Sequence, residues 1–305
     1  MTISLELQIV RECAFGIVDA AMIEHLPHGL CIEPLVPKKL TQSAHLMPAL
    51  IDLRRTPKES LNALLREIEE LCVRGESPSV SLFIKTDSGI TELAQHWNAM
   101  QVAEPQRGRK LWVRLHDPRV LHQILRLLNL TQRRTLFGRS HEFIYWVGGK
   151  WFAAAREVPS VLSHRTLENS GNVQYGGLQK WDWNRIERIG LVNRALLGAQ
   201  INDAATLTDQ SALAEQLIER AVMQYKLSEP ADLVEFAVRG MQTNPVFDEC
   251  DNVARAIRPD PNLAEKSNLS DRFALIDTQI WNSLRQPINS SGNMQDDHTK
   301  KMRVL

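Results

Sequence analysis

The side chains that could carry out catalysis in this sequence are few, and they do not form a known catalytic pattern. His116 and Asp117 are adjacent, and His141 follows later in the chain. A histidine close to an acid can act as a general base, so these three residues could form a hydrolase site if they converged in one concave pocket. We favour the simpler explanation, in which each histidine is an ordinary surface or half-buried side chain.

Common enzyme and metal-binding patterns are absent from the sequence. It contains no GxGxxG, GxxxxGK[ST], HExxH or GxSxG pattern. His25 and His28 could share one helical face, but Pro27 between them indicates a loop, and no third ligand is suitably spaced. We therefore predict no catalytic residues, no cofactor, no metal ion and no small-molecule substrate.

The most distinctive local pattern is the sequence HDPRVL at residues 116–121. Asp117 suits the N-cap of a helix, where its carboxylate accepts hydrogen bonds from backbone N–H groups and faces the positive end of the helix dipole. Pro118 suits the first helical position, where no N–H is needed. This explanation is structural, and it leaves Arg119 open for another role.

The charges of the chain are balanced overall but unevenly placed, with 36 basic and 36 acidic residues. Residues 107–139 contain nine Lys or Arg and one acid, whereas residues 203–277 contain fourteen acids and seven bases. Solvated helix faces explain most of this pattern, and the basic stretch could also bind an acidic protein. The candidate partner-binding residues are Arg107, Arg109, Arg126, Arg133 and Arg134. Nucleic acid is a weaker alternative, because the chain has no basic excess and no aromatic stacking motif.

Several features favour a cytoplasmic location. The four cysteines form no CxxC pair and fit the reduced thiols of a cytosolic protein. No run reaches the ~18 apolar residues that a membrane span needs, and the N-terminus is a poor signal peptide. We therefore expect no membrane partner.

The order of secondary-structure signals predicts two lobes. Strand-like runs alternate with amphipathic helices, and the series ends in a hairpin around Gly148 and Gly149. One of these helices has the start of a capping box at Thr56, Pro57 and Glu59. From about residue 179 only helical periods remain. We predict an α/β or α+β lobe with a mixed sheet flanked by helices at 1–158, a linker at 159–178, an all-α lobe at 179–286 and a disordered tail at 287–305.

Several blocks of the sequence, taken in order, resemble those of a known family. A strand leads into Asp117-Pro118-Arg119 and a leucine-rich helix, and Leu136-Phe137-Gly138 and the aromatic strand 143–146 follow. Residues 16–20 (GIVDA) resemble the opening strand of that family, and the similarity covers about residues 13–146 and more weakly 221–248. The family is that of the type VI secretion effector-adaptor chaperones, called Tap or TEC proteins.

The resemblance implies a non-catalytic adaptor. Such proteins bind a toxic effector in the cytoplasm of the producing bacterium and deliver it to the spike protein VgrG. His116 stands where we expect an aromatic or similar residue in the family. The residues that match the family pattern, with a structural or partner-binding role, are Asp19, Asp117, Pro118, Arg119, Phe137, Gly138 and Trp146.

Overall fold

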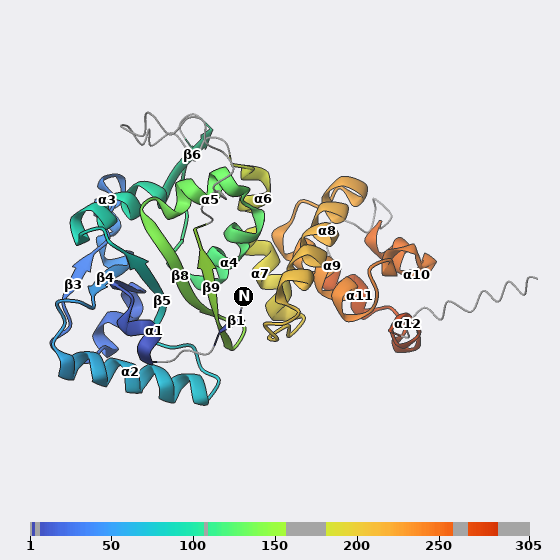
Figure 1. The fold of residues 1–305 in the computed structure, drawn as a ribbon. Coiled ribbons are helices and arrows are strands. Elements are labelled where there is room, and N and C mark those ends of the chain that lie inside the picture. Colours follow the sequence, from blue (N-terminus) through green and yellow to red (C-terminus); the bar gives the residue numbers. More distant parts are fainter. Residues whose placement is uncertain (1, 4–6, 107–108, 157–180, 259–267, 286–305) are drawn as a thin grey trace, which may run out of the picture.

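The structure is a computed structural model that describes residues 2–3, 7–106, 109–156, 181–258 and 268–285. Its first part, residues 2–156, is the sheet region, and its second part, residues 181–285, is the helical region (Figure 1). The linker expected at 159–178 and the tail expected at 287–305 lie outside the described residues. The division of the chain into lobes at residue 158 stays a prediction.

Within the described ranges, seven strands form one open sheet in which each neighbouring pair is antiparallel. The expected fold class, a sheet flanked by helices and followed by helices alone, is confirmed. The pairing refines the expected mixed sheet to an antiparallel one. In spatial order the strands are β1 (Thr2–Ile3), β9 (Lys150–Ala155), β8 (Ser140–Val147), β5 (Val80–Thr86), β2 (Phe15–Val18), β4 (Ala49–Asp52) and β3 (Ile32–Pro34).

The central strand β5 contributes to two hydrophobic cores, because successive side chains of a strand point to opposite faces of the sheet. Leu82 and Ile84 lie in the core that α3, α4 and α5 cover, whereas Phe83 lies in the core that α2 covers with Leu64 and Ile68. Helices therefore cover both faces of the sheet (Figure 1). These helices are α2 (Lys58–Val73), α3 (Ile90–Met100), α4 (Pro118–Leu127) and α5 (Leu130–Phe137).

The strand predicted at residues 110–115 forms, but it does not join the main sheet. It is β7 (Arg109–Trp112), and it pairs with β6 (Val102–Gln106) in a separate two-stranded ribbon. The smaller elements of the sheet region are α1 (Leu7–Arg11) and the 3₁₀ helices η1 (Ala20–His25) and η2 (Lys38–Leu46).

The helical region lies beside α4 and continues the core of the sheet region (Figure 1). Leu217, Phe236 and Phe247 are fully buried at its centre and belong to the same hydrophobic cluster as Phe143 of the sheet. No helix within the described ranges is both long and apolar enough to cross a membrane. The helices are α6 (Trp183–Glu187), α7 (Ile189–Gly198), α8 (Leu207–Tyr225), α9 (Pro230–Gln242), η4 (Phe247–Glu249), α10 (Asp251–Ile257), α11 (Leu269–Ala274) and α12 (Thr278–Leu284).

A polar network at the junction, here the Glu215 cluster of Gln123, Arg126, Arg185, Ser211 and Glu215, joins α4 to α6 and α8. Glu215 accepts a hydrogen bond from Nη2 of Arg126 at 2.8 Å and two from Arg185, one of them from Nη2 at 2.9 Å. Nε2 of Gln123 donates to Oγ of Ser211 at 2.7 Å. Hydrogen bonds between buried groups have strict geometry, so this network fixes how the helical region sits on the sheet region.

Candidate functional site

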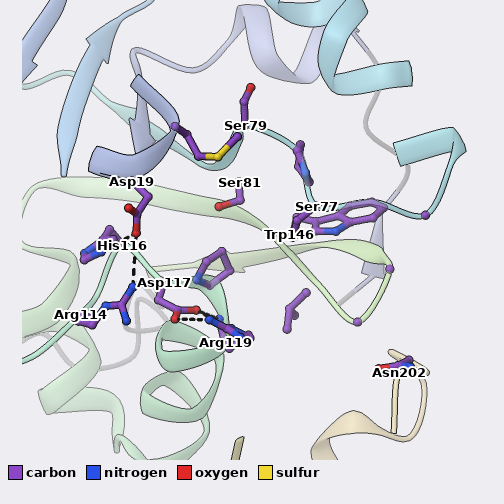
Figure 2. A pocket seen from close by; sticks show the side chains of 17 residues that line it. Asp19, Ser77, Ser79, Ser81, Arg114, His116, Asp117, Arg119, Trp146 and Asn202 are labelled. Atoms are coloured by element: carbon purple, nitrogen blue, oxygen red, sulfur yellow. Dashed lines mark hydrogen bonds and ion pairs between the residues drawn. The ribbon is translucent and has the colours of Figure 1, made fainter. Parts of the chain in front are cut away.

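A pocket of about 680 Å³ opens beside the N-terminal end of α4, at one end of the sheet (Figure 2). Separate segments of the chain line it, so it is formed by the fold rather than by one loop. These segments are Asp19 and Met22 after β2, Gly75 to Ser81 around the start of β5, Arg114 to Arg119 before and in α4, Trp146 to Gly149 at the β8–β9 turn, and Asn202 between α7 and α8.

Asp19 is held in place by contacts on both carboxylate oxygens. It caps η1, where Oδ1 accepts a hydrogen bond from the backbone N–H of Ala21 at 3.0 Å. Oδ2 lies 3.3 Å from Nε2 of His116 and 3.4 Å from Nη2 of Arg114. The contact with His116 is the main cause that lowers the pKa of Asp19 well below its usual value, against the opposing effect of burial. Asp19 therefore stays ionised.

His116 is a buried side chain that closes the inner wall of the pocket. Its ring stacks on Trp112 with the centroids 5.6 Å apart, and its side chain is 1% exposed. Within the described residues, Nδ1 has no hydrogen-bond partner. A half-buried structural histidine was the simpler expectation, and the stacking on Trp112 accounts for the position of the ring.

Asp117 and Arg119 form a paired acid and base at the mouth of the pocket (Figure 2). Oδ1 of Asp117 accepts hydrogen bonds from the backbone N–H and from Nε of Arg119, both at 3.0 Å, and Oδ2 accepts one from Nη2 at 2.8 Å. Burial raises the pKa of Asp117, but the hydrogen bonds and charge of Arg119 outweigh it, so the pKa is lowered. The predicted N-cap of α4 is confirmed, with Pro118 in its first turn.

The β8–β9 turn supplies an aromatic wall and close backbone. Trp146 is 8% exposed and packs edge-on against Trp151, with the ring centroids 5.4 Å apart. Gly148 and Gly149 both have positive φ, 59° and 75°, which glycine adopts without strain. The predicted hairpin is therefore present, and a side chain at Gly148 would press on the backbone of Ala204 in the helical region.

Asn202 brings the helical region to the pocket. It is exposed, and it lies in the connection between α7 and α8 (Figure 2). The pocket therefore has walls from both regions of the molecule.

A second pocket of about 360 Å³ lies where β7 and α4 face α6 and α7. Its lining is largely apolar and includes Leu111, Val120 and Ile186. Arg109, one of the candidate partner-binding residues, stands at this pocket and forms a 3.0 Å ion pair with Glu187.

The structure brings five of the residues that match the family pattern to the first pocket and places two elsewhere. Asp19, Asp117, Pro118, Arg119 and Trp146 line it. Phe137 and Gly138 instead lie at the end of α5 in the core of the sheet region. The Phe137 ring stacks on that of Phe143 at 4.1 Å, and Gly138 has a φ of 55° with no space for a side chain beside His96. These two have a structural explanation.

The candidate partner-binding arginines do not form one face. Arg107 lies outside the described residues. Arg126 is 14% exposed and belongs to the Glu215 cluster, and Arg133 donates to the carbonyl oxygen of Leu125 at 2.7 Å. Arg134 is half-buried on α5. Arg126 and Arg133 therefore have internal roles that the sequence did not indicate.

The third member of the hydrolase hypothesis is remote from the other two. His141 is exposed and contacts Asp87 through Nε2 at 2.7 Å. It lies five positions before Trp146 on β8, about 16 Å along the strand at about 3.3 Å per residue, and it does not line the pocket. The structure does not bring His141 together with His116 and Asp117. Within the described residues, no group of three or more His, Cys, Asp or Glu could hold a metal ion.

Among the residues that help to form the pocket and that sequence reasoning did not single out are Ser79, Arg114 and Asn202. Ser79 and Asn202 come from segments without a chemical motif, whereas Arg114 lies in the basic stretch just before His116, and the sequence carries no signal that the three lie together. Only the strand order and the packing of the helical region against the β8–β9 turn unite them.

Comparison with known proteins identifies one related family. The model of a family described as "Domain of unknown function (DUF4123)" matches residues 15–135, which run from β2 to α5. No curated protein and no solved structure matches the chain significantly. Residues 15–135, which supply most of the pocket, are therefore similar to this DUF4123 family.

Proposed function

We propose that this protein is a non-catalytic adaptor that binds a type VI secretion effector in the cytoplasm and loads it onto the spike protein VgrG. The observation that carries the proposal is the DUF4123 match, because this domain family is associated with type VI secretion effector adaptors. The effector and VgrG are the partners that the resemblance of the sequence to the Tap or TEC proteins implies.

The position of the pocket supports a binding role. Asp19, Asp117 and Arg119, which belong to the blocks that resemble the adaptor family, converge at a surface pocket rather than in the core. The acids there are held by hydrogen bonds from neighbouring donors, which suits a preformed recognition surface more than proton transfer.

The junction between the two regions supports docking of a partner at this face. Both pockets lie where the sheet region meets the helical region, one with a polar lining and one with a largely apolar lining. Apolar burial supplies most of the affinity in protein interfaces, and polar contacts set register and specificity.

Deletion of the gene in its native host tests this function. We expect one effector to disappear from the secreted fraction while the other substrates of the same secretion apparatus remain, since an adaptor serves a dedicated cargo. Expression of the chain from a plasmid should restore export of that effector. Unchanged secretion of every effector in the deletion strain would contradict the proposal, as would loss of all secretion, which would indicate a part of the apparatus.

A further inference from the structure

We propose that the pocket beside the N-terminal end of α4 binds an acidic segment of the partner polypeptide, with one carboxylate seated between Arg114 and Arg119. This inference rests on the proposed function, since it describes which chemical class of segment the adaptor recognises. It is carried by the hydrogen-bonding capacity that the pocket leaves unused.

Both carboxylates of the pocket already have positively charged or N–H partners. Both oxygens of Asp117 accept hydrogen bonds from Arg119. In Asp19, Oδ1 accepts the Ala21 N–H, and Oδ2 contacts Arg114 and His116. A cationic side chain entering the pocket would be repelled by the guanidinium groups of Arg114 and Arg119, which does not favour a lysine or arginine as the ligand.

The donors of the pocket are not fully used. Arg119 donates hydrogen bonds to Asp117 from Nε and Nη2, and within the described residues its Nη1 has no hydrogen-bond partner. Arg114 makes one hydrogen bond within the described residues, to Asp19 at 3.4 Å, and its guanidinium group lies 5.7 Å from the centroid of the Trp112 ring. Their side chains are 65% and 47% exposed, so both guanidinium groups reach solvent.

The paired acids prepare the arginines for a carboxylate. Each acid stands behind one guanidinium group and restricts its orientation, so less side-chain entropy is lost when the outer N–H groups bind a ligand. Arg–carboxylate hydrogen bonds are short and directional, and they are stronger than those between neutral groups.

The charge balance favours a protein over a nucleic acid. The two arginines are matched by two ionised acids, so the pocket offers no excess of positive charge to a polyanion, whose affinity depends on such an excess. A single carboxylate flanked by neutral peptide groups needs only directional donors. The pocket volume of about 680 Å³ leaves space for a short extended segment.

A selection experiment with the purified full chain tests the proposal without any knowledge of the natural partner. Random short peptides displayed on a surface serve as the probe, and a selected peptide is then measured by fluorescence anisotropy against its Glu-to-Gln and Asp-to-Asn counterpart. We expect acidic residues to be enriched at one position and the neutral counterpart to bind about tenfold more weakly, as for loss of one charge-assisted hydrogen bond.

Variants of the chain locate the binding. Arg114→Gln with Arg119→Gln should remove the preference for acidic peptides, whereas Arg139→Gln should keep it. Arg139 is a matched control because it is also an exposed arginine paired with an acid, Glu92, and lies outside the pocket. Asp117 still caps α4 in the double variant, since the cap uses the backbone N–H of residue 119.

A second pair of variants leaves the residues of the ion pairs unchanged. Asn202→Asp adds a negative charge at the exposed rim and should weaken binding of the acidic peptide about threefold, and Asn202→Lys should strengthen it by a similar factor. Equal binding of neutral and acidic peptides would overturn the proposal, as would an acidic preference that persists in the double arginine variant. A preference for single-stranded DNA over every peptide would also overturn it. These outcomes leave the secretion test of the adaptor function unaffected.

Discussion

Two clusters of charged side chains in this molecule contain the same chemical groups in different surroundings. In the Glu215 cluster at the junction, the carboxylate side chain is 10% exposed and Arg126 is 14% exposed. In the pocket, Asp117 is equally buried at 9%, but its partner Arg119 is 65% exposed. Between these two ion pairs the difference lies in the base rather than in the acid.

This difference indicates what each cluster can do. In the Glu215 cluster two guanidinium groups share one carboxylate, and Gln123 and Ser211 extend the network between the regions. Arg126 is enclosed inside the molecule, whereas the side chain of Arg185 is 43% exposed. In the pocket each acid fixes an arginine whose outer N–H groups still face solvent. Exposure of the guanidinium group, more than its place in a basic stretch, therefore distinguishes Arg126, which stabilises the fold, from Arg119, which can bind a partner.

The largest effect should come from breaking the closed cluster. Glu215→Ala should lower the free energy of unfolding by about 3 kcal/mol, because it leaves Arg126 largely buried without its counter-charge. Urea denaturation followed by circular dichroism measures this change. Glu219→Gln is the control, since Glu219 lies on the same helix with a side chain 62% exposed and an ion pair of 3.9 Å, and its effect should stay below about 0.5 kcal/mol. Similar losses in both variants would refute the distinction between the clusters.

A smaller effect should follow removal of the acid in the open cluster. Asp117→Ala should lower the free energy of unfolding by about 1 kcal/mol, because α4 loses its N-cap. Asp117→Asn separates the cap from the ion pair, since asparagine caps as well as aspartate but holds Arg119 less firmly. We expect Asp117→Asn to keep most of the stability, as measured by thermal unfolding. A melting temperature unchanged by Asp117→Ala would argue against the cap.

The pH dependence of stability provides a third test of the open cluster. The pKa of Asp19 is lowered in the folded protein, mainly by its contact with His116. Its contribution to stability is therefore complete above its unfolded value of about 4 and is lost as the pH falls toward the lower folded value. Asp19→Asn should flatten the loss of stability in this acid range, which urea unfolding at a series of pH values measures. Parallel curves for the variant and the parent chain would contradict the assignment.

The smallest effects concern the remaining arginines of the basic stretch. Arg133→Glu should lower stability by about 1 kcal/mol, because Arg133 donates to the carbonyl of Leu125 near the end of α4. Arg134→Glu should change the free energy of unfolding by less than about 0.5 kcal/mol, as is usual for surface substitutions. Any loss of effector binding in this variant would therefore report a partner contact rather than loss of stability. Reversal of the Arg134 charge should weaken the complex with the effector. A pull-down with undiminished effector recovery by the Arg134→Glu variant would argue against a partner role for this stretch.

Local signals predicted local structure well. Asp117 and Pro118 predicted the start of α4, and Gly148 with Gly149 predicted the turn between β8 and β9. In these cases the chemistry that favours the element lies within a few neighbouring residues, so no knowledge of the rest of the fold is needed.

Tertiary contacts explain where sequence reasoning was incomplete. Thr56 was predicted to cap α2, but the N-cap is Pro57, and the Thr56 hydroxyl donates instead to the carbonyl of Asp52 at 2.7 Å. Arg126 looked like a surface base in a basic stretch, yet α8 places Glu215 against it. The pocket likewise could not be predicted without the tertiary structure, because Ser79, Arg114 and Asn202 come from segments that are far apart in the sequence. These outcomes depend on partners that are remote in the sequence, which periodicity and capping rules do not specify.

The most direct test of the central claim is a three-component capture experiment. The candidate effector and VgrG are co-expressed with or without this chain, VgrG is captured by an affinity tag, and the recovered effector is quantified. We predict that VgrG retains the effector only when the chain is present, and that the double variant Arg114→Gln with Arg119→Gln reduces this recovery while Arg139→Gln does not. Equal recovery of the effector by VgrG in the absence of the chain would contradict the account.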